Sequence, residues 1–141
     1  MNKGIEMSKQ FIENAKKRGA AFKREVVAAT ESAQAVDIAV SYLQMSGWFL
    51  LEGALKRVSE RNIRIITTDQ MNVTQPAVLR AAIRRGIHVR CYRGNRVFHP
   101  KVFVIHGTDK ANDVAIVGSA NISFSGLEGC LLYTSPSPRD S

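Results

Sequence analysis

Cysteine is almost absent from this chain. Its 141 residues include two cysteines, Cys91 and Cys130, and Cys130 lies in a C-terminal stretch that is set aside below. The one remaining thiol cannot form an intramolecular disulfide, which excludes a small fold held together by disulfide bonds. A lone thiol fits a reducing compartment, and we expect a cytoplasmic protein.

Long apolar runs are also absent. No stretch approaches the roughly 20 apolar residues that a membrane-spanning helix needs, and the N-terminus lacks the apolar core of a signal peptide. We therefore expect no membrane partner. The composition, with 45% apolar and 23% charged residues, is typical of one globular domain.

Acidic residues are scarce relative to basic ones. Twelve Asp and Glu stand against twenty Lys and Arg, which gives a net charge of +8. An excess of this sign favours a polyanionic partner, and we expect nucleic acid, most simply DNA. The candidate phosphate contacts are Arg80, Arg84, Arg93 and Arg96. An ordinary solvated surface is an equally good interpretation of these arginines.

Patterns that bind metals or nucleotides are missing. Four residues could serve as zinc ligands, but their spacing fits no common zinc motif: His88, Cys91, His99 and His106. There is no carboxylate cluster for magnesium and no Gly-Lys pair of a phosphate-binding loop. We expect neither a metal nor a cofactor. A Ser119–His99–Asp113 triad is a further alternative, although no nucleophile-elbow sequence surrounds the serine.

Alternating strand and helix patterns indicate the fold class. The periodicity predicts helices over 7–34, 47–61 and 74–85, strands over 35–43, 64–68 and 87–92, and a hairpin over 102–105 and 114–117. Pro76 falls in the first turn of the third helix and Gly86 follows its end. Strands that alternate with helices predict an α/β domain with a mixed, mostly parallel sheet covered by helices.

The strongest functional signal comes from two short polar motifs in apolar surroundings. His99 and Lys101 are two residues apart, as are Ser119 and Asn121. On a strand, such pairs point to one face. If the hairpin pairs about Lys110, residue 99 faces 121 and residue 101 faces 119. An imidazole, an ammonium, a hydroxyl and an amide then converge, which is a set suited to phosphate chemistry.

These residues, His99-x-Lys101 and Gly118-Ser119-x-Asn121, resemble the HxK…GSxN signature of the phospholipase D superfamily. The resemblance covers roughly residues 20 to 128 and is strongest to nuclease-type members, the modules of some restriction endonucleases and helicase-fused proteins. Ser41, Tyr42, Thr68 and Asp69, at predicted strand ends, belong to the similar region. One position departs from the pattern, because His106 stands where the family usually has an aspartate. Asp109 or Asp113 could replace that aspartate if the loop is displaced.

The resemblance implies a phospholipase D-like fold, catalytic residues His99, Lys101, Ser119 and Asn121, and a mechanism without metal. His99 would attack phosphorus and form a phosphohistidine, and a second histidine would protonate the leaving group. Because the chain contains one motif, we expect a homodimer; a second motif further along the gene is the alternative.

Three functions remain open on this basis. The first is a metal-independent nuclease, the second is a phospholipid-acting enzyme of the same fold, and the third is a degenerate nucleic-acid-binding domain. The basic charge favours the first over the second. The intact His99, Lys101, Ser119 and Asn121 disfavour the third.

Residues 130–141 resemble the translation of a sequencing adapter rather than a natural sequence. We therefore expect residues 1–129 to be an incomplete catalytic domain that is truncated at its C-terminal end and could lack activity on its own. Residues 130–141 are expected to be a non-native tail, either disordered or packed nonspecifically.

Overall fold

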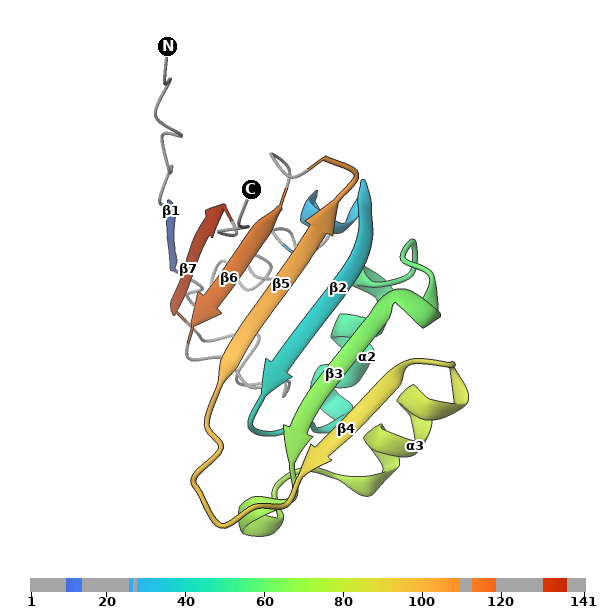
Figure 1. The fold of residues 1–141 in the computed structure, drawn as a ribbon, viewed down its shortest axis with the longest axis vertical. Helices are drawn as coiled ribbons and strands as arrows, with labels where there is room; N and C mark the ends of the chain where they lie inside the picture. Colours follow the sequence, from blue (N-terminus) through green and yellow to red (C-terminus); the bar gives the residue numbers. More distant parts are fainter. Residues whose placement is uncertain (1–9, 14–25, 27, 110–112, 119–130, 137–141) are drawn as a thin grey trace.

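The computed structural model describes residues 10–13, 26, 28–109, 113–118 and 131–136. A seven-stranded sheet with the order β1-β7-β6-β5-β2-β3-β4 forms the body of the molecule (Figure 1). Its strands are β1 (Gln10–Glu13), β2 (Ala33–Val40), β3 (Ile63–Thr68), β4 (His88–Tyr92), β5 (Lys101–Gly107), β6 (Val114–Gly118) and β7 (Leu131–Pro136). Between the parallel strands run the helices α2 (Met45–Ala54) and α3 (Pro76–Arg84) and the short 3-10 turns η2 (Glu60–Asn62) and η3 (Gln70–Asn72).

The predicted α/β class with a mixed sheet is confirmed. Strands β2, β3 and β4 are parallel neighbours, and α2 and α3 form the connections between them. The pairs β2–β5, β5–β6, β6–β7 and β1–β7 are antiparallel. Among the described strands antiparallel pairs therefore outnumber parallel ones, because β5 returns beside β2 and starts an antiparallel run. The expectation of a mostly parallel sheet holds only for β2 to β4.

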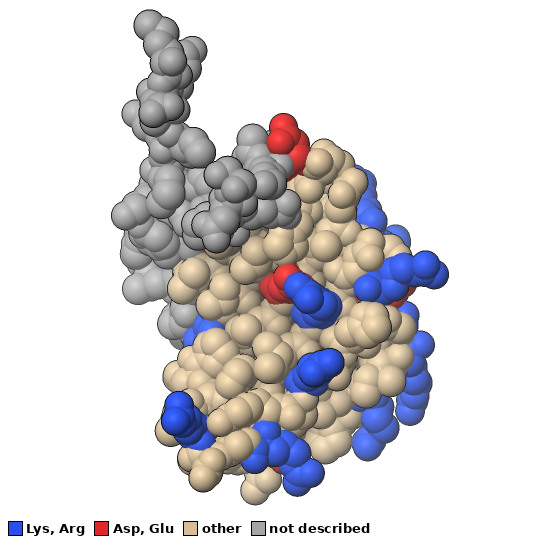
Figure 2. All heavy atoms as spheres, in the orientation of Figure 1, with Lys and Arg blue, Asp and Glu red and all other residues tan. Residues whose placement is uncertain are grey.

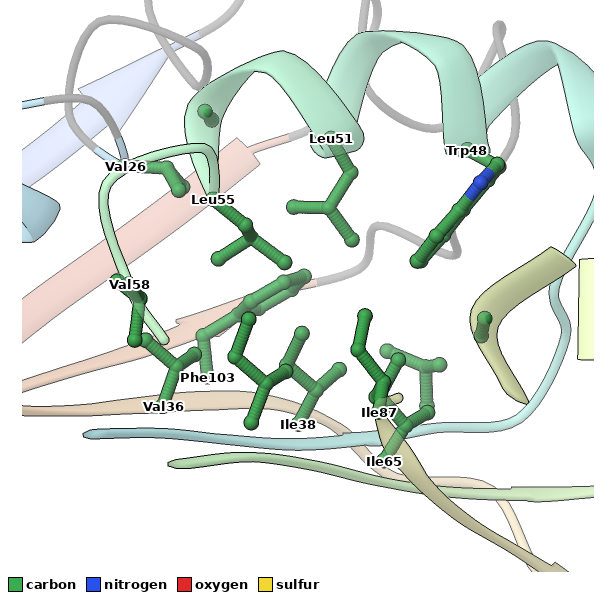
Figure 3. Close-up of a cluster of buried hydrophobic side chains, with 14 of the residues drawn as sticks. Val26, Val36, Ile38, Trp48, Leu51, Leu55, Val58, Ile65, Ile87 and Phe103 are labelled. Atoms are coloured by element: carbon green, nitrogen blue, oxygen red, sulfur yellow. The ribbon is translucent and has the colours of Figure 1, made fainter. Parts of the chain in front are cut away.

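The hydrophobic core lies between the sheet and the two helices, which share one face of the sheet (Figures 1 and 3). From the helix side, Trp48, Leu51 and Leu55 enter it, spaced so that they fall on one side of α2 and its end. They meet sheet residues that are 2% exposed or less, namely Val36, Ile38, Ile65 and Phe103. Phe49, which is next to Trp48 in the chain, lies on another side of the helix and is 66% exposed.

Helix α2 is shorter than predicted. It ends at Ala54, whose carbonyl lies 2.9 Å from the hydroxyl of buried Thr30. A tighter turn follows, in which Val58 N–H donates to Leu55 O at 3.1 Å. Leu55 and Val58 are buried, although the helix does not continue through residue 61 as predicted. Neither described helix combines the length and apolar character needed to cross a membrane.

Helix α3 agrees with its sequence signals. Pro76 occupies its first turn, where a missing N–H costs nothing. Gly86 follows its end with φ of 93°, in the left-handed region that favours glycine. These two residues set where α3 starts and stops, and β4 returns to the sheet directly after it.

The two ends of the chain differ from the sequence expectations. Residues 10–13, predicted inside a helix, form strand β1 instead. Residues 131–136, expected to be disordered or packed nonspecifically, form strand β7 between β1 and β6. A strand edge such as that of β6 presents unpaired N–H and C=O groups that accept an extended segment. This pairing overrides local helix propensity at residues 10–13. The origin of the tail stays a prediction.

The face of the sheet opposite α2 and α3 is open over strands β2 to β5 in the described part of the chain, and Figure 2 shows it. A hollow of about 580 Å³ lies on this face. Its lining includes the apolar Ile66, Val102 and Val104 and the basic Arg61, Arg64 and Arg90. His99 and Lys101 are not part of this lining.

Candidate active site

The candidate site lies where the parallel strands β2 and β3 end. Ser41 follows β2 and is fully buried. Its backbone N–H donates to Pro100 O at 2.9 Å, and its hydroxyl donates to the same carbonyl at 3.2 Å. The start of β5 is thereby fixed beside the end of β2, with Val40 opposite Lys101. The carboxyl ends of parallel strands are the usual position for ligands in open α/β sheets.

The structure brings His99 and Lys101 together. Lys101 Nζ lies 3.0 Å from His99 Nδ1 and 3.1 Å from His99 Nε2, and 3.5 Å from Ser41 Oγ. His99 is exposed and Lys101 is half-buried. Burial lowers the pKa of the Lys101 ammonium from its ordinary value, because a charged group loses hydration there. The structure therefore places an imidazole and an ammonium group in contact at this end of the sheet.

The two side chains come together in a different way from the prediction, which placed both residues on one strand. β5 begins at Lys101, so His99 lies in the preceding loop rather than on the strand. Pro100 separates them, and its carbonyl is held by Ser41. The Tyr42 ring also contacts the imidazole of His99, with ring centroids 6.2 Å apart and an interplanar angle of 76°. This is the edge-on geometry that aromatic rings prefer.

The second motif lies outside the described residues at Ser119 and Asn121, so their part in the site stays a prediction. The pairing predicted for the hairpin is off by one residue. Val102 pairs with Val117 rather than with Gly118. At the other end of this strand pair, Asp113 Oδ1 accepts the Gly107 N–H at 3.0 Å.

Buried hydroxyl groups that sequence reasoning did not single out support the end of β2. Ser41 O accepts hydrogen bonds from Thr67 Oγ1 at 3.0 Å and from Thr74 Oγ1 at 3.4 Å. Thr74 Oγ1 also accepts the Leu43 N–H at 3.2 Å. Threonine at a strand end is common, so the sequence carried no signal for this network. It holds the segment that positions Pro100.

Thr68 and Asp69, which the sequence placed near the site, bind the neighbouring strand instead. Thr68 Oγ1 donates to Tyr92 O at 2.7 Å, and Asp69 Oδ2 lies 2.9 Å from Arg93 Nε. Both contacts join the end of β3 to the end of β4. They therefore fix the start of the loop that leads to His99.

The four candidate nucleic-acid contacts do not lie together. Arg93 and Arg96 are exposed in the loop between β4 and His99, whereas Arg80 and Arg84 are exposed on α3. Helix α3 runs back along the sheet toward the start of β4 (Figure 1). Arg84 is the last residue of α3, so it lies at the end of the sheet opposite the site. Contact with a bound phosphate chain stays a prediction for all four arginines.

His106 does not replace the missing family aspartate near the reacting groups. It lies at the far end of β5, with Nε2 2.9 Å from Asp37 Oδ2 and Nδ1 3.7 Å from Asp113 Oδ2. Five residues of strand correspond to about 16 Å, which also removes Asp113 from reach of His99. The structure therefore does not bring Asp113 to His99, as the alternative Ser119–His99–Asp113 triad requires. Asp113 lies beside His106, so a supporting role for Asp109 or Asp113 in place of the family aspartate stays a prediction.

Asp37 connects three strands at this far end. Arg64 binds it through two hydrogen bonds of 2.6 and 2.7 Å, and His106 approaches the same carboxylate. The bound Arg64 guanidinium lowers the pKa of Asp37, against the opposing effect of burial, and His106 contributes in the same direction as Arg64. Among the described residues no group of three or more His, Cys, Asp or Glu side chains is placed to hold a metal ion.

Comparison with known proteins agrees with this geometry. A family model described as "Cardiolipin synthase, PLD-like domain" matches residues 25–131. The fold is similar to NucT from Helicobacter pylori, with a TM-score of 0.68 and 17% identity over 94% of this chain and 87% of NucT. It is also similar to Nuc from Salmonella typhimurium, a phospholipase D family member, with a TM-score of 0.61 and 21% identity over 92% of this chain and 82% of Nuc.

A larger protein has a similar fold over part of its length. Yeast tyrosyl-DNA phosphodiesterase matches with a TM-score of 0.62 and 13% identity, over 93% of this chain but 32% of its own length. At these identities the solved structures show the fold alone. The comparison with curated proteins finds no relative.

Proposed function

Because the chain belongs to the phospholipase D-like domain family, we propose that it is a metal-independent phosphodiesterase that cleaves nucleic acid through a phosphohistidine intermediate on His99. The observation that carries the proposal is the contact between His99 and Lys101 at the end of β2. Phosphoryl transfer needs an in-line nucleophile, a cation for the non-bridging oxygens and a proton for the leaving oxygen. His99 and Lys101 are the candidates for the first two of these roles.

The proposed reaction has two steps. A ring nitrogen of His99 attacks phosphorus and forms a P–N bond, while the bond from phosphorus to the leaving oxygen breaks and that oxygen takes a proton from a second imidazole. The Lys101 ammonium donates hydrogen bonds to the non-bridging oxygens as their charge changes. Water then gives a proton to the second imidazole, attacks phosphorus and releases His99.

Nucleic acid is the favoured substrate because of charge. The chain carries a net charge of +8, and Arg93 and Arg96 are exposed in the segment that leads to His99. Among proteins with a similar fold, the yeast enzyme is by name a phosphodiesterase of tyrosyl-DNA. A phospholipid phosphodiester is the second candidate, because the matching family model takes its description from cardiolipin synthase.

Cleavage in the presence of chelator tests the mechanism. We expect single- or double-stranded DNA to be cut at an unchanged rate in excess EDTA, because Lys101 supplies the positive charge that a metal ion would otherwise provide. The chain and, where its gene continues past residue 129, the full-length product are assayed beside a magnesium-dependent nuclease as control. Loss of cutting in EDTA with recovery in magnesium would refute the proposal, and turnover of phosphatidyl substrates alone would favour the second candidate.

A second copy of the chain is the proposed source of the second imidazole. One His99 cannot be both the nucleophile and the acid in the same step, and a twofold axis would bring two identical sites together. We expect sedimentation equilibrium to give a dimer for the active protein. An active monomer would contradict this, unless the gene continues past residue 129 into a second motif.

A further inference from the structure

The loop that leads to His99 receives little support from the backbone. Residues 94–98 belong to no helix or strand, and among the described residues no backbone–backbone hydrogen bond involves them. A loop of this kind would leave the imidazole free to move over several ångströms. Catalysis by a nucleophile needs much closer control of position.

The side chain of Gln70, in turn η3 after β3, supplies that support. Its Nε2 donates to Gly94 O at 3.1 Å and to Arg96 O at 2.6 Å. Its Oε1 accepts the N–H of Phe98 at 3.0 Å. One amide group thus uses both of its donor hydrogens and its acceptor on three different points of the same loop.

Gln70 is itself held in place at the end of β3. Its backbone N–H donates to Thr68 Oγ1 at 3.2 Å, and that hydroxyl donates to Tyr92 O. The next residue, Met71, has φ of 63°, an unusual value for a residue other than glycine. The turn is therefore shaped so that the Gln70 side chain crosses from the end of β3 to the loop beside β4.

Aromatic packing also holds the loop, at Phe98. Tyr92 stacks on Phe98 with centroids 5.2 Å apart and an interplanar angle of 25°. A Cβ atom on Gly94 would overlap the Tyr92 phenol ring, which explains why the loop has a glycine there. Phe98 is thus held by both its N–H and its ring.

From these contacts we infer that Gln70 is a positioning residue for His99. Hydrogen bonds anchor both chain neighbours of His99: Phe98 N–H donates to Gln70 Oε1, and Pro100 O accepts from the N–H and the hydroxyl of Ser41. The anchor at Ser41 belongs to the strand pairing of β2 with β5, whereas the anchor at Gln70 depends on one side chain. The inference rests on the proposed role of His99 and adds a residue that the motif does not contain.

Two substitutions test the inference on the complete chain. Gln70→Ala removes all three hydrogen bonds, and Gln70→Glu keeps the acceptor for Phe98 N–H but sets a carboxylate against two carbonyl oxygens. We expect kcat to fall about 10- to 100-fold in both, with KM changed less than about threefold, since misplacement of a reacting group by about 1 Å has effects of this size. Gln75→Ala is the matched control, because it removes a glutamine–backbone bond, to Met45 N–H, away from the loop.

A second measurement does not depend on activity. We expect the amide of Phe98 to exchange with solvent at least about tenfold faster in Gln70→Ala, and the His99 ring resonances to shift, while the amides of β5 and the thermal midpoint stay near wild type. Unchanged exchange and ring resonances would overturn the inference, as would loosening of the loop with unchanged kcat. A wild-type protein that turns over no phosphodiester would instead refute the proposed function, and Gln70 would then be a structural clamp only.

Discussion

Replacement of His99 by alanine is expected to abolish turnover, with a loss of at least about 10⁴-fold in kcat. The imidazole is exposed, and the Lys101 ammonium lies about 3 Å from both of its ring nitrogens. The fold should survive, because His99 lies in a loop outside the hydrophobic core.

The matched control is His88→Ala. His88 is also an exposed histidine, but it is the first residue of β4 and lies at the end of the sheet opposite the site. Circular dichroism and thermal unfolding establish that both variants fold. Denaturation of wild type in alkaline detergent with ³²P-labelled substrate should trap a phosphoryl group that is stable in alkali and lost on later acid treatment, and His99→Ala should trap none. A His99→Ala variant that turns over at a near wild-type rate would show that another residue is the nucleophile.

Local signals in the sequence were sufficient for the parallel part of the fold. Pro76 and Gly86 marked the two ends of α3, and the apolar runs marked β3 and β4 within one or two residues. These signals depend on residues that are close together in the chain, so they can be identified from a single sequence. Strand β1 could not be predicted in this way, because its only described pairing is with β7, more than a hundred positions away in the chain.

The candidate site was predictable in its chemistry but not in its supports. The two-residue spacing of His99 and Lys101 predicted their convergence, which the structure shows, although through a loop rather than a strand. Gln70 carried no signal, because a glutamine in a turn is ordinarily solvated and its three partners lie 24 to 28 positions later. His106 was interpreted by its position in the motif, and the structure instead pairs it with Asp37, a contact across 69 positions.

Removal of the Lys101 ammonium has the second largest expected effect. Lys101→Met should lower kcat by about 10²- to 10³-fold, since a fixed cation stabilises charge on the non-bridging oxygens only if it is present and oriented before reaction. Lys101→Arg keeps the positive charge but replaces the compact ammonium group with a larger, planar guanidinium, so we expect partial activity. Lys56→Met, on an exposed turn after α2, is the control and should be neutral.

The pH dependence gives an independent measure of the same group. Burial lowers the pKa of Lys101 below its ordinary value of 10.5, so the ammonium begins to lose its proton at a lower pH than a solvated lysine would. The charged form acts in catalysis, so kcat/KM should fall on the alkaline side, starting below the pH range in which free lysine titrates. In Lys101→Arg the guanidinium stays protonated throughout, and this alkaline fall should disappear. If the fall persists unchanged in the arginine variant, the titrating group is not Lys101 and its proposed role as the fixed cation is wrong.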